Sequence, residues 1–311
     1  MTACGTPVCL FRLCLRGQPL HTRQLILPRW AIALPGLLAC GMAFAEATQE
    51  GVGVDAAIRA ANNELRVAVG ATHLKYHEFD THHQVDSGYL DSEQGTQPVV
   101  EGMWRRQATL FGLDDIYTSI DASYSRGHTT YNGYAIDLAS PTGVGTPQTE
   151  RMSDITFDAD VRLGRALRFA MLPVLQVTPY LTYGFHHRTR NGLERYEHQV
   201  AGAGVLCQVA LTPAMVAQAD VMVGRTFDAR MRTPGLPLAV LGSRPTEALG
   251  LGLDIAVTRR LHVTLDYRAA TFAYGESAPA NGYFAGRYGQ WFEPESRSWT
   301  QTATVGVAWS L

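Results

Sequence analysis

Two pairs of side chains have a spacing that could support acid–base chemistry. Asp80 and His82 are two residues apart, and so are Asp158 and Asp160, which places each pair on one side of an extended chain. Paired groups of this kind can hold and transfer a proton. Asp80, His82, Asp158 and Asp160 are therefore the candidate catalytic residues. The alternative is that the carboxylates form structural ion pairs inside the fold.

Histidines form two adjacent pairs, His82-His83 and His186-His187. Neutral imidazole is a common ligand of zinc, copper and nickel, so the four residues are candidate metal ligands if the pairs meet at one end of the fold. No spacing matches a known metal motif, and ordinary polar loop content is the alternative. We expect no cofactor, because no glycine-rich phosphate loop follows a strand. We also find no Ser–His arrangement typical of a hydrolase.

The elements that must position these residues are strands with one apolar and one small or polar face. At the end of the chain, Val305, Val307 and Trp309 alternate with Thr304, Gly306, Ala308 and Ser310. The same period of two recurs in ten segments, which we expect to be strands: 64–79, 97–111, 116–125, 152–164, 172–187, 195–210, 215–227, 246–257, 261–275 and 297–311.

The connections between these segments are sorted by length. Tight ones follow the second, sixth and eighth segments, whereas long polar ones lie near 80–96, 126–151, 228–245 and 276–296. Alternation of short turns with long loops is typical of a membrane barrel. A secreted β-sandwich or a lipocalin-like barrel is the alternative. Residues 131–138 could extend the barrel above the membrane or form a further hairpin.

The first 45 residues have the features of a secretory signal with an extended N-region. An apolar run over 30–45 follows Arg29 and ends in Ala43-Phe44-Ala45, a small-residue cleavage site. We expect removal of 1–45, a short periplasmic lead-in at 46–63 that is too small to plug a lumen, and a barrel over 64–311. A lipoprotein acylated at Cys40 is the alternative.

The charge composition limits the kinds of binding partner that are expected. Residues 1–45 contain four of the 26 basic and none of the 28 acidic side chains, so the expected mature chain has a net charge of about −6. Nucleic acid is not expected as a partner, because phosphate binding needs a basic surface. Cys207 is the single cysteine after residue 45, so no intrachain disulfide is expected in the mature chain.

The signal, the sorted loops and the terminal strand over 302–311 resemble those of small outer-membrane β-barrel proteins of Gram-negative bacteria, in the general pattern of OmpA-like and porin-like barrels. The resemblance implies an all-β, antiparallel up-and-down transmembrane barrel with short periplasmic turns and long outer loops. Ten strands are expected, with eight or twelve as alternatives. It also implies that the terminal strand engages the barrel-assembly machinery and that the wall contacts outer-membrane lipid and lipopolysaccharide. Such strands usually end in Phe or Trp, whereas this one ends in Leu311, with Trp309 two residues earlier.

The function expected from this pattern is non-enzymatic. A barrel of ten strands is nearly filled by its own side chains, so the protein should act through its outer loops or as a narrow channel. An outer-membrane protease or lipid-modifying hydrolase with its site at the outer rim is the first alternative, and a soluble periplasmic ligand carrier is the second. The adjacent Arg105 and Arg106 leave one question open, because a regular strand must turn one of them toward lipid.

Overall fold

The computed structural model describes residues 51–85, 87–137, 143–284 and 287–311. The predicted signal over 1–45, its cleavage after Ala45 and the alternative acylation of Cys40 lie outside these ranges. Within the described part of the chain, no helix is long and apolar enough to cross a bilayer.

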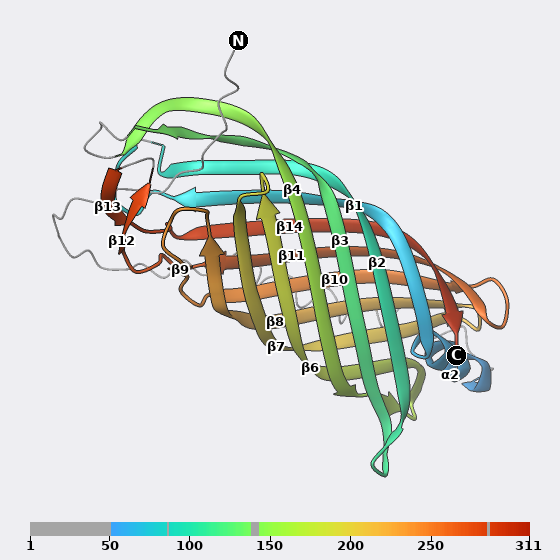
Figure 1. Cartoon of the computed structure of the whole chain (residues 1–311). Coiled ribbons are helices and arrows are strands. Elements are labelled where there is room, and N and C mark those ends of the chain that lie inside the picture. The colour runs from blue at the N-terminus through green and yellow to red at the C-terminus, as the bar shows by residue number, and fades with distance from the viewer. Residues whose placement is uncertain (1–50, 86, 138–142, 285–286) are drawn as a thin grey trace.

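Ten long antiparallel strands form a closed barrel (Figure 1). Each strand pairs with the next along the chain, and β1 pairs with β14 from Glu64↔Ser310 to Glu78↔Ser296, which closes the sheet. The predicted all-β, up-and-down barrel of ten strands is confirmed. The strands are β1 (Glu64–Phe79), β2 (Tyr89–Leu110), β3 (Leu113–Ile136), β4 (Val144–Arg165), β6 (Leu172–Arg190), β7 (Glu194–Thr212), β8 (Met215–Arg232), β10 (Pro245–Ala256), β11 (Leu261–Tyr274) and β14 (Ser296–Ser310).

Four short strands and one helix complete the described structure. They are α2 (Gly51–Ala61), β5 (Leu167–Phe169), β9 (Ala239–Val240), β12 (Ala280–Phe284) and β13 (Arg287–Trp291). The hairpin of β12 and β13 lies at one end of the barrel, whereas α2 and the C-terminus lie at the other (Figure 1). We call the first the outer end and the second the periplasmic end.

The apolar residues of the strands face outward. In β1, Leu65 and Val67 are 53% and 59% exposed, whereas Arg66 and Ala68, which alternate with them, are 4% and 2% exposed. A soluble barrel would have the opposite distribution, so the outer face is suited to lipid. Inward glycines let the wall pack closely: a Cβ on Gly70 would lie 1.9 Å from the carbonyl oxygen of Ala303.

The outward apolar residues form a band that stops before the outer end. In β1, the outward positions above this band are His73, Lys75 and His77. Strands β2, β3 and β4 continue far beyond the band, with Tyr131 of β3 opposite Glu150 of β4. The segment that begins at residue 131 therefore extends the barrel. Most of the predicted loops 80–96 and 126–151 are strand, because paired strands can continue above a membrane with polar residues on both faces.

The connections are sorted by end, as predicted. Those at the periplasmic end are 111–112, 166–171, 213–214 and 257–260, and those at the outer end include the long segments 80–88, 233–244 and 275–295. The outer connection 191–193 is a short exception. At the two arginines the strand stays regular: Arg105 faces inward and is 7% exposed, whereas Arg106 is on the outer face, four residues before β2 ends.

Helix α2 occupies the periplasmic mouth of the barrel. Ala57, Ile58 and Ala61 pack on inward-facing residues of the barrel wall, Val174, Ala210 and Val216. The following residue, Asn62, is fully buried and donates to Gln107 at 2.9 Å and to Gln208 at 2.8 Å. The lead-in expected to be too small to plug the lumen thus covers its periplasmic mouth, because three small or branched side chains suffice for so narrow an opening.

Candidate functional site

The centre of the barrel contains a belt of paired charges. Arg162 donates to Asp160 and to Asp220, both at 2.9 Å, and Asp220 also accepts from the Tyr180 hydroxyl at 2.6 Å. Arg66 pairs with Asp266. A cavity of about 250 Å³ is lined by the charged residues of this belt, Arg66, Asp160, Arg162, Asp220 and Asp266. Buried charges are retained when they are paired and hydrogen-bonded, so the predicted structural ion pairs account for most of the belt.

A second group of charges closes the lumen toward the outer end. We call Glu93, Asp154, Arg188, Arg190 and Glu194 the outer ion-pair layer. Arg188 joins Glu93 and Asp154, both at 2.7 Å, while Arg190 joins Glu93 at 3.0 Å and Glu194 at 2.7 Å. Their side chains are at most 4% exposed. Each guanidinium is held by two carboxylates in charge-assisted hydrogen bonds, which fix its position.

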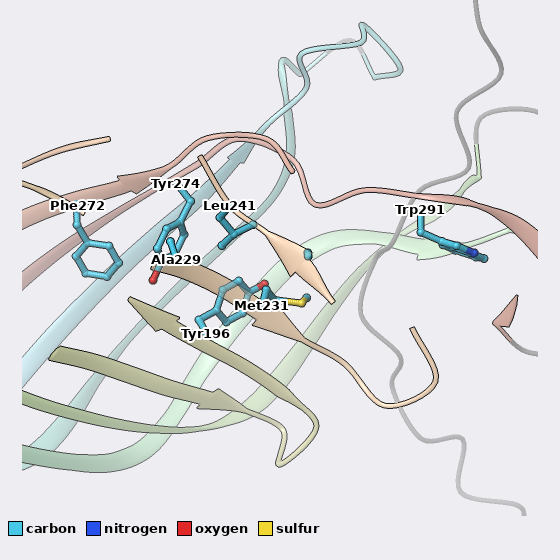
Figure 2. Packing of buried hydrophobic residues seen from close by; sticks show 8 residues of the cluster. Tyr196, Ala229, Met231, Leu241, Phe272, Tyr274 and Trp291 are labelled. Atoms are coloured by element: carbon cyan, nitrogen blue, oxygen red, sulfur yellow. The ribbon is translucent and has the colours of Figure 1, made fainter. Parts of the chain in front are cut away.

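Aromatic rings support this layer from above. The Arg190 guanidinium lies 5.7 to 5.9 Å from the ring centres of Tyr76, Tyr131 and Tyr196. Tyr196 also packs on Tyr274, Leu241 and Met231 in the buried cluster shown in Figure 2. Cation–π contacts of this kind strengthen when they are desolvated.

A buried acid in the loop before β14 belongs to the same end. Glu293 is 1% exposed and accepts from the Tyr196 hydroxyl at 2.9 Å. Burial raises the pKa of its carboxyl well above the ordinary value, and the nearby Glu78 and Glu194 raise it further. A protonated Glu293 can stay buried here without a cationic partner.

The predicted catalytic residues are not brought to one site. Asp80 lies in the outer loop 80–88, where its carboxylate accepts the backbone N–H of Val85 at 2.6 Å, and His82 lies 3.1 Å from Glu276. Asp158 and Asp160 line the cavity, below the outer ion-pair layer. Asp158 is 2.6 Å from His186 Nδ1, which gives an acid–histidine pair that the sequence spacing did not indicate.

The four candidate metal ligands are also separated. His186 faces the interior, 4.7 Å from the ring of His198, whereas the adjacent His187 faces outward and contacts Glu197 at 3.1 Å. His82 packs on Phe292 in the outer loops. In the described ranges, the one group of three metal-ligating side chains whose ligand atoms lie within 4.8 Å of one another is elsewhere, at Glu64, Asp254 and His262.

That group lies at the periplasmic end, where sequence reasoning identified no site. His262 Nδ1 is 2.6 Å from Asp254 Oδ1, and its Nε2 is 2.9 Å from Ser310 Oγ. The sequence analysis found no Ser–His arrangement typical of a hydrolase, and it did not indicate this contact, because Ser310 and His262 lie 48 residues apart in the chain. The inward parity of His262, Asp254 and Ser310 on neighbouring strands was the available signal.

Comparison with known proteins gives a fold and no closer relationship. No protein-family model and no curated protein sequence matches the chain. The outer membrane protease OmpT from Escherichia coli has a similar structure, with a TM-score of 0.50 at 8% identity over 80% of this chain and 97% of that one. The translocator domain of the autotransporter NalP from Neisseria meningitidis matches with a TM-score of 0.40 at 11% identity, over 89% of this chain and 95% of that one. Together with the closed ten-stranded barrel and its outward apolar face, the OmpT match shows that the chain has the fold of outer-membrane β-barrel proteins.

Proposed function

We propose that the protein is an integral outer-membrane barrel that acts through its outer loops and does not conduct solutes. The observation that carries this proposal is that buried ion pairs lie across the lumen toward its outer end while α2 packs in its periplasmic mouth. A hydrated ion would have to displace guanidinium–carboxylate pairs that are almost completely buried, which is costly in a low-dielectric interior. Of the two expected modes of action, outer loops or a narrow channel, the geometry favours the loops.

The hairpin of β12 and β13 is the most prominent surface for such a role. Tyr283 and Tyr288 are paired across the hairpin, are 66% and 62% exposed, and have ring centres 5.0 Å apart. At its base, Trp291 is buried and donates to the carbonyl of Gly282 at 3.0 Å. Exposed tyrosines on a rigid support resemble the aromatic anchors of protein-binding surfaces.

Planar-bilayer recording of the purified, refolded protein tests the channel part of the proposal. We expect no conductance steps under conditions in which a general porin conducts, and reproducible steps would contradict closure. Adherence of bacteria that display the protein to epithelial cells and to one another tests the loops. Tyr283→Ser with Tyr288→Ser should reduce adherence at equal surface amounts, whereas Tyr124→Ser, an outward position in the barrel wall, should not. An unchanged adherence of the hairpin variant would count against this surface.

The second candidate function is hydrolysis inside the barrel. The Asp158–His186 pair, at 2.6 Å and beside the cavity, is the specific observation that favours it, since such a pair can act as a general base. The outer ion-pair layer lies between this pair and the outer loops, so we place this function second. Cleavage of a mixed peptide library that is lost in Asp158→Asn would establish this function. Retained cleavage in that variant would exclude it.

Export belongs to the same proposal. We infer cleavage after Ala45, so that N-terminal sequencing of protein from the outer-membrane fraction should begin at Glu46. An acylated start at Cys40 would support the lipoprotein alternative.

A further inference from the structure

Three ligating side chains from three strands converge inside the periplasmic mouth. Glu64 begins β1, Asp254 is near the end of β10 and His262 is near the start of β11. One ligand atom from each lies within 4.8 Å of the other two. All three residues are at most 5% exposed. The group is therefore buried, and because all three residues belong to strands, the barrel wall fixes the positions of their side chains.

Strand register explains the convergence. The neighbours of His262 at positions 261 and 263 face lipid, so its ring points inward. Ala256 of β10 is opposite His262, which puts Asp254 one inward position away. On the other side, His262 is opposite Ala308 of β14, and Ser310 of the same strand is opposite Glu64. The three ligating residues thus belong to one continuous inward surface.

Two oxygens of the group have no partner. Glu64 Oε2 and Asp254 Oδ2 are buried and accept no hydrogen bond from the described residues. The nearby cation, Arg105, is 3.9 Å from the other oxygen of Glu64 and donates at 3.0 Å to Gln218. Buried carboxylate oxygens are almost always satisfied in folded proteins, so an unmatched pair beside an imidazole indicates a missing proton or cation.

The histidine is oriented for a cation. Ser310 Oγ is 2.9 Å from His262 Nε2 and fixes the ring, leaving Nδ1 turned toward Asp254 and away from Ser310. In metal-binding histidines, the ring nitrogen that does not bind the metal regularly makes a hydrogen bond, which fixes the orientation and the tautomer of the ring. One ligand atom from each of the two carboxylates lies within 4.8 Å of a ring nitrogen of His262, so the position between the three side chains suits a positive charge.

We propose that Glu64, Asp254 and His262 bind a zinc ion at the periplasmic mouth, with water as the fourth ligand. One imidazole and two carboxylates are a ligand set that zinc accepts in tetrahedral geometry. The Nδ1–Oδ1 separation of 2.6 Å widens by about 0.7 Å to admit the ion, because tetrahedral ligand atoms about 2.0–2.1 Å from zinc lie about 3.3 Å apart. Bound there, zinc links β1 to β10 and β11 across β14, which is where the first and last strands close the barrel.

Metal analysis of the whole purified, refolded protein tests this proposal. The protein is stripped with a chelator, incubated with zinc alone, desalted and assayed by elemental analysis, with cobalt as a spectroscopic substitute. We expect one zinc per chain and a tetrahedral cobalt spectrum. His262→Gln and Glu64→Gln should each reduce zinc affinity at least tenfold. The control variant, His82→Ala with His83→Ala, removes two outer-loop histidines and should leave the stoichiometry unchanged.

Gel mobility before and after heating shows whether each variant is folded. The cobalt spectrum is recorded on the unaltered protein, so it tests the proposal even if a variant fails to fold. Failure of the unaltered protein to take up zinc at millimolar concentration would overturn the proposal. Uptake that survives in folded His262→Gln, or that is lost in the His82/His83 variant, would do so too. The melting temperature of the unaltered protein should rise with added zinc. An equal melting temperature in zinc and in chelator would contradict the proposal, because it would mean that the three side chains form a structural network that binds no metal.

Discussion

Leu251→Arg should severely destabilise the barrel in a bilayer. Leu251 is in the outward row of β10, is 48% exposed, and is opposite Tyr267 and Ala219 of the neighbouring strands, which are also outward. An arginine on the lipid face near the midplane costs about 2–4 kcal/mol. Since 1.36 kcal/mol is a factor of ten, the folding equilibrium should fall by roughly 30- to 1000-fold. Urea titration of protein folded into phospholipid vesicles, followed by tryptophan emission, measures this change.

The matched control is Val240→Arg. Val240 is 62% exposed in β9, beside the outer loops and beyond the apolar band, so its replacement should change the free energy of unfolding by less than about 0.5 kcal/mol. Gel mobility should show that both variants fold in detergent, where an arginine can reach water. Equal destabilisation by the two substitutions would refute the assignment of the outward face to lipid. So would a Leu251→Arg protein as stable as the unaltered one.

Three further predictions concern the two ends. Glu93→Gln leaves two buried guanidinium groups without their shared carboxylate and should cost about 3–5 kcal/mol in urea titrations, whereas a loss below 1 kcal/mol would contradict a closed outer layer. Glu293→Gln should stabilise the protein increasingly as pH rises from 5 to 8. Burial raises the pKa of this carboxyl in the folded state, so ionisation of the unfolded chain above pH 4.5 favours unfolding, and a flat difference between melting curves would oppose this. Ile58→Asp should release α2 from the mouth, seen as rapid proteolysis of residues 51–61 with the barrel intact, and a resistant helix would show that other contacts hold it.

Strand number and facing could be predicted because lipid imposes a strict alternation. Leu65 and Val67 against Arg66 and Ala68 show it in the sequence as clearly as in the structure. Strand ends at the periplasmic side were predicted to within three residues, since tight turns such as Leu211–Ala214 leave a composition signal. The outer ends of β2, β3, β4, β6 and β8 were placed too low, because strand pairing there continues among polar residues that lack a periodic pattern. The outer ends of the other five long strands were predicted to within one residue.

The interior contacts could be predicted in kind but not in detail. Inward charges imply ion pairs, but the sequence does not show which charges pair. Arg66 pairs with Asp266, 200 residues away, because closure of the barrel brings their strands close together. Helix α2 left a legible signal in the spacing of Ala57, Ile58 and Ala61, which suits one apolar face. The prediction that the lead-in over 46–63 is too small to plug the lumen was wrong, because the lumen of a ten-stranded barrel is narrow enough for one short helix to cover its mouth.

The two ends of the lumen differ in how their charges are balanced, and this leads to a last prediction. In the outer ion-pair layer, Arg188 and Arg190 are each held by two carboxylates. Glu194 Oε1 is buried there without a hydrogen bond, but Arg190 holds the other oxygen of that carboxylate at 2.7 Å. At the periplasmic mouth, Glu64 and Asp254 each keep an unpartnered oxygen, so that end depends on what fills it. Removal of divalent metal should therefore loosen one end selectively.

Hydrogen exchange of the refolded protein can resolve the two ends. With chelator, amides at the start of β1 and near Ser310 should exchange faster than in zinc, because opening of the closure between β1 and β14 exposes them. Amides of residues 188–194 should exchange at the same rate in both conditions and are the internal control. Faster exchange at both ends would indicate general destabilisation by the chelator, and no change at either end would mean that the mouth is stable without an ion.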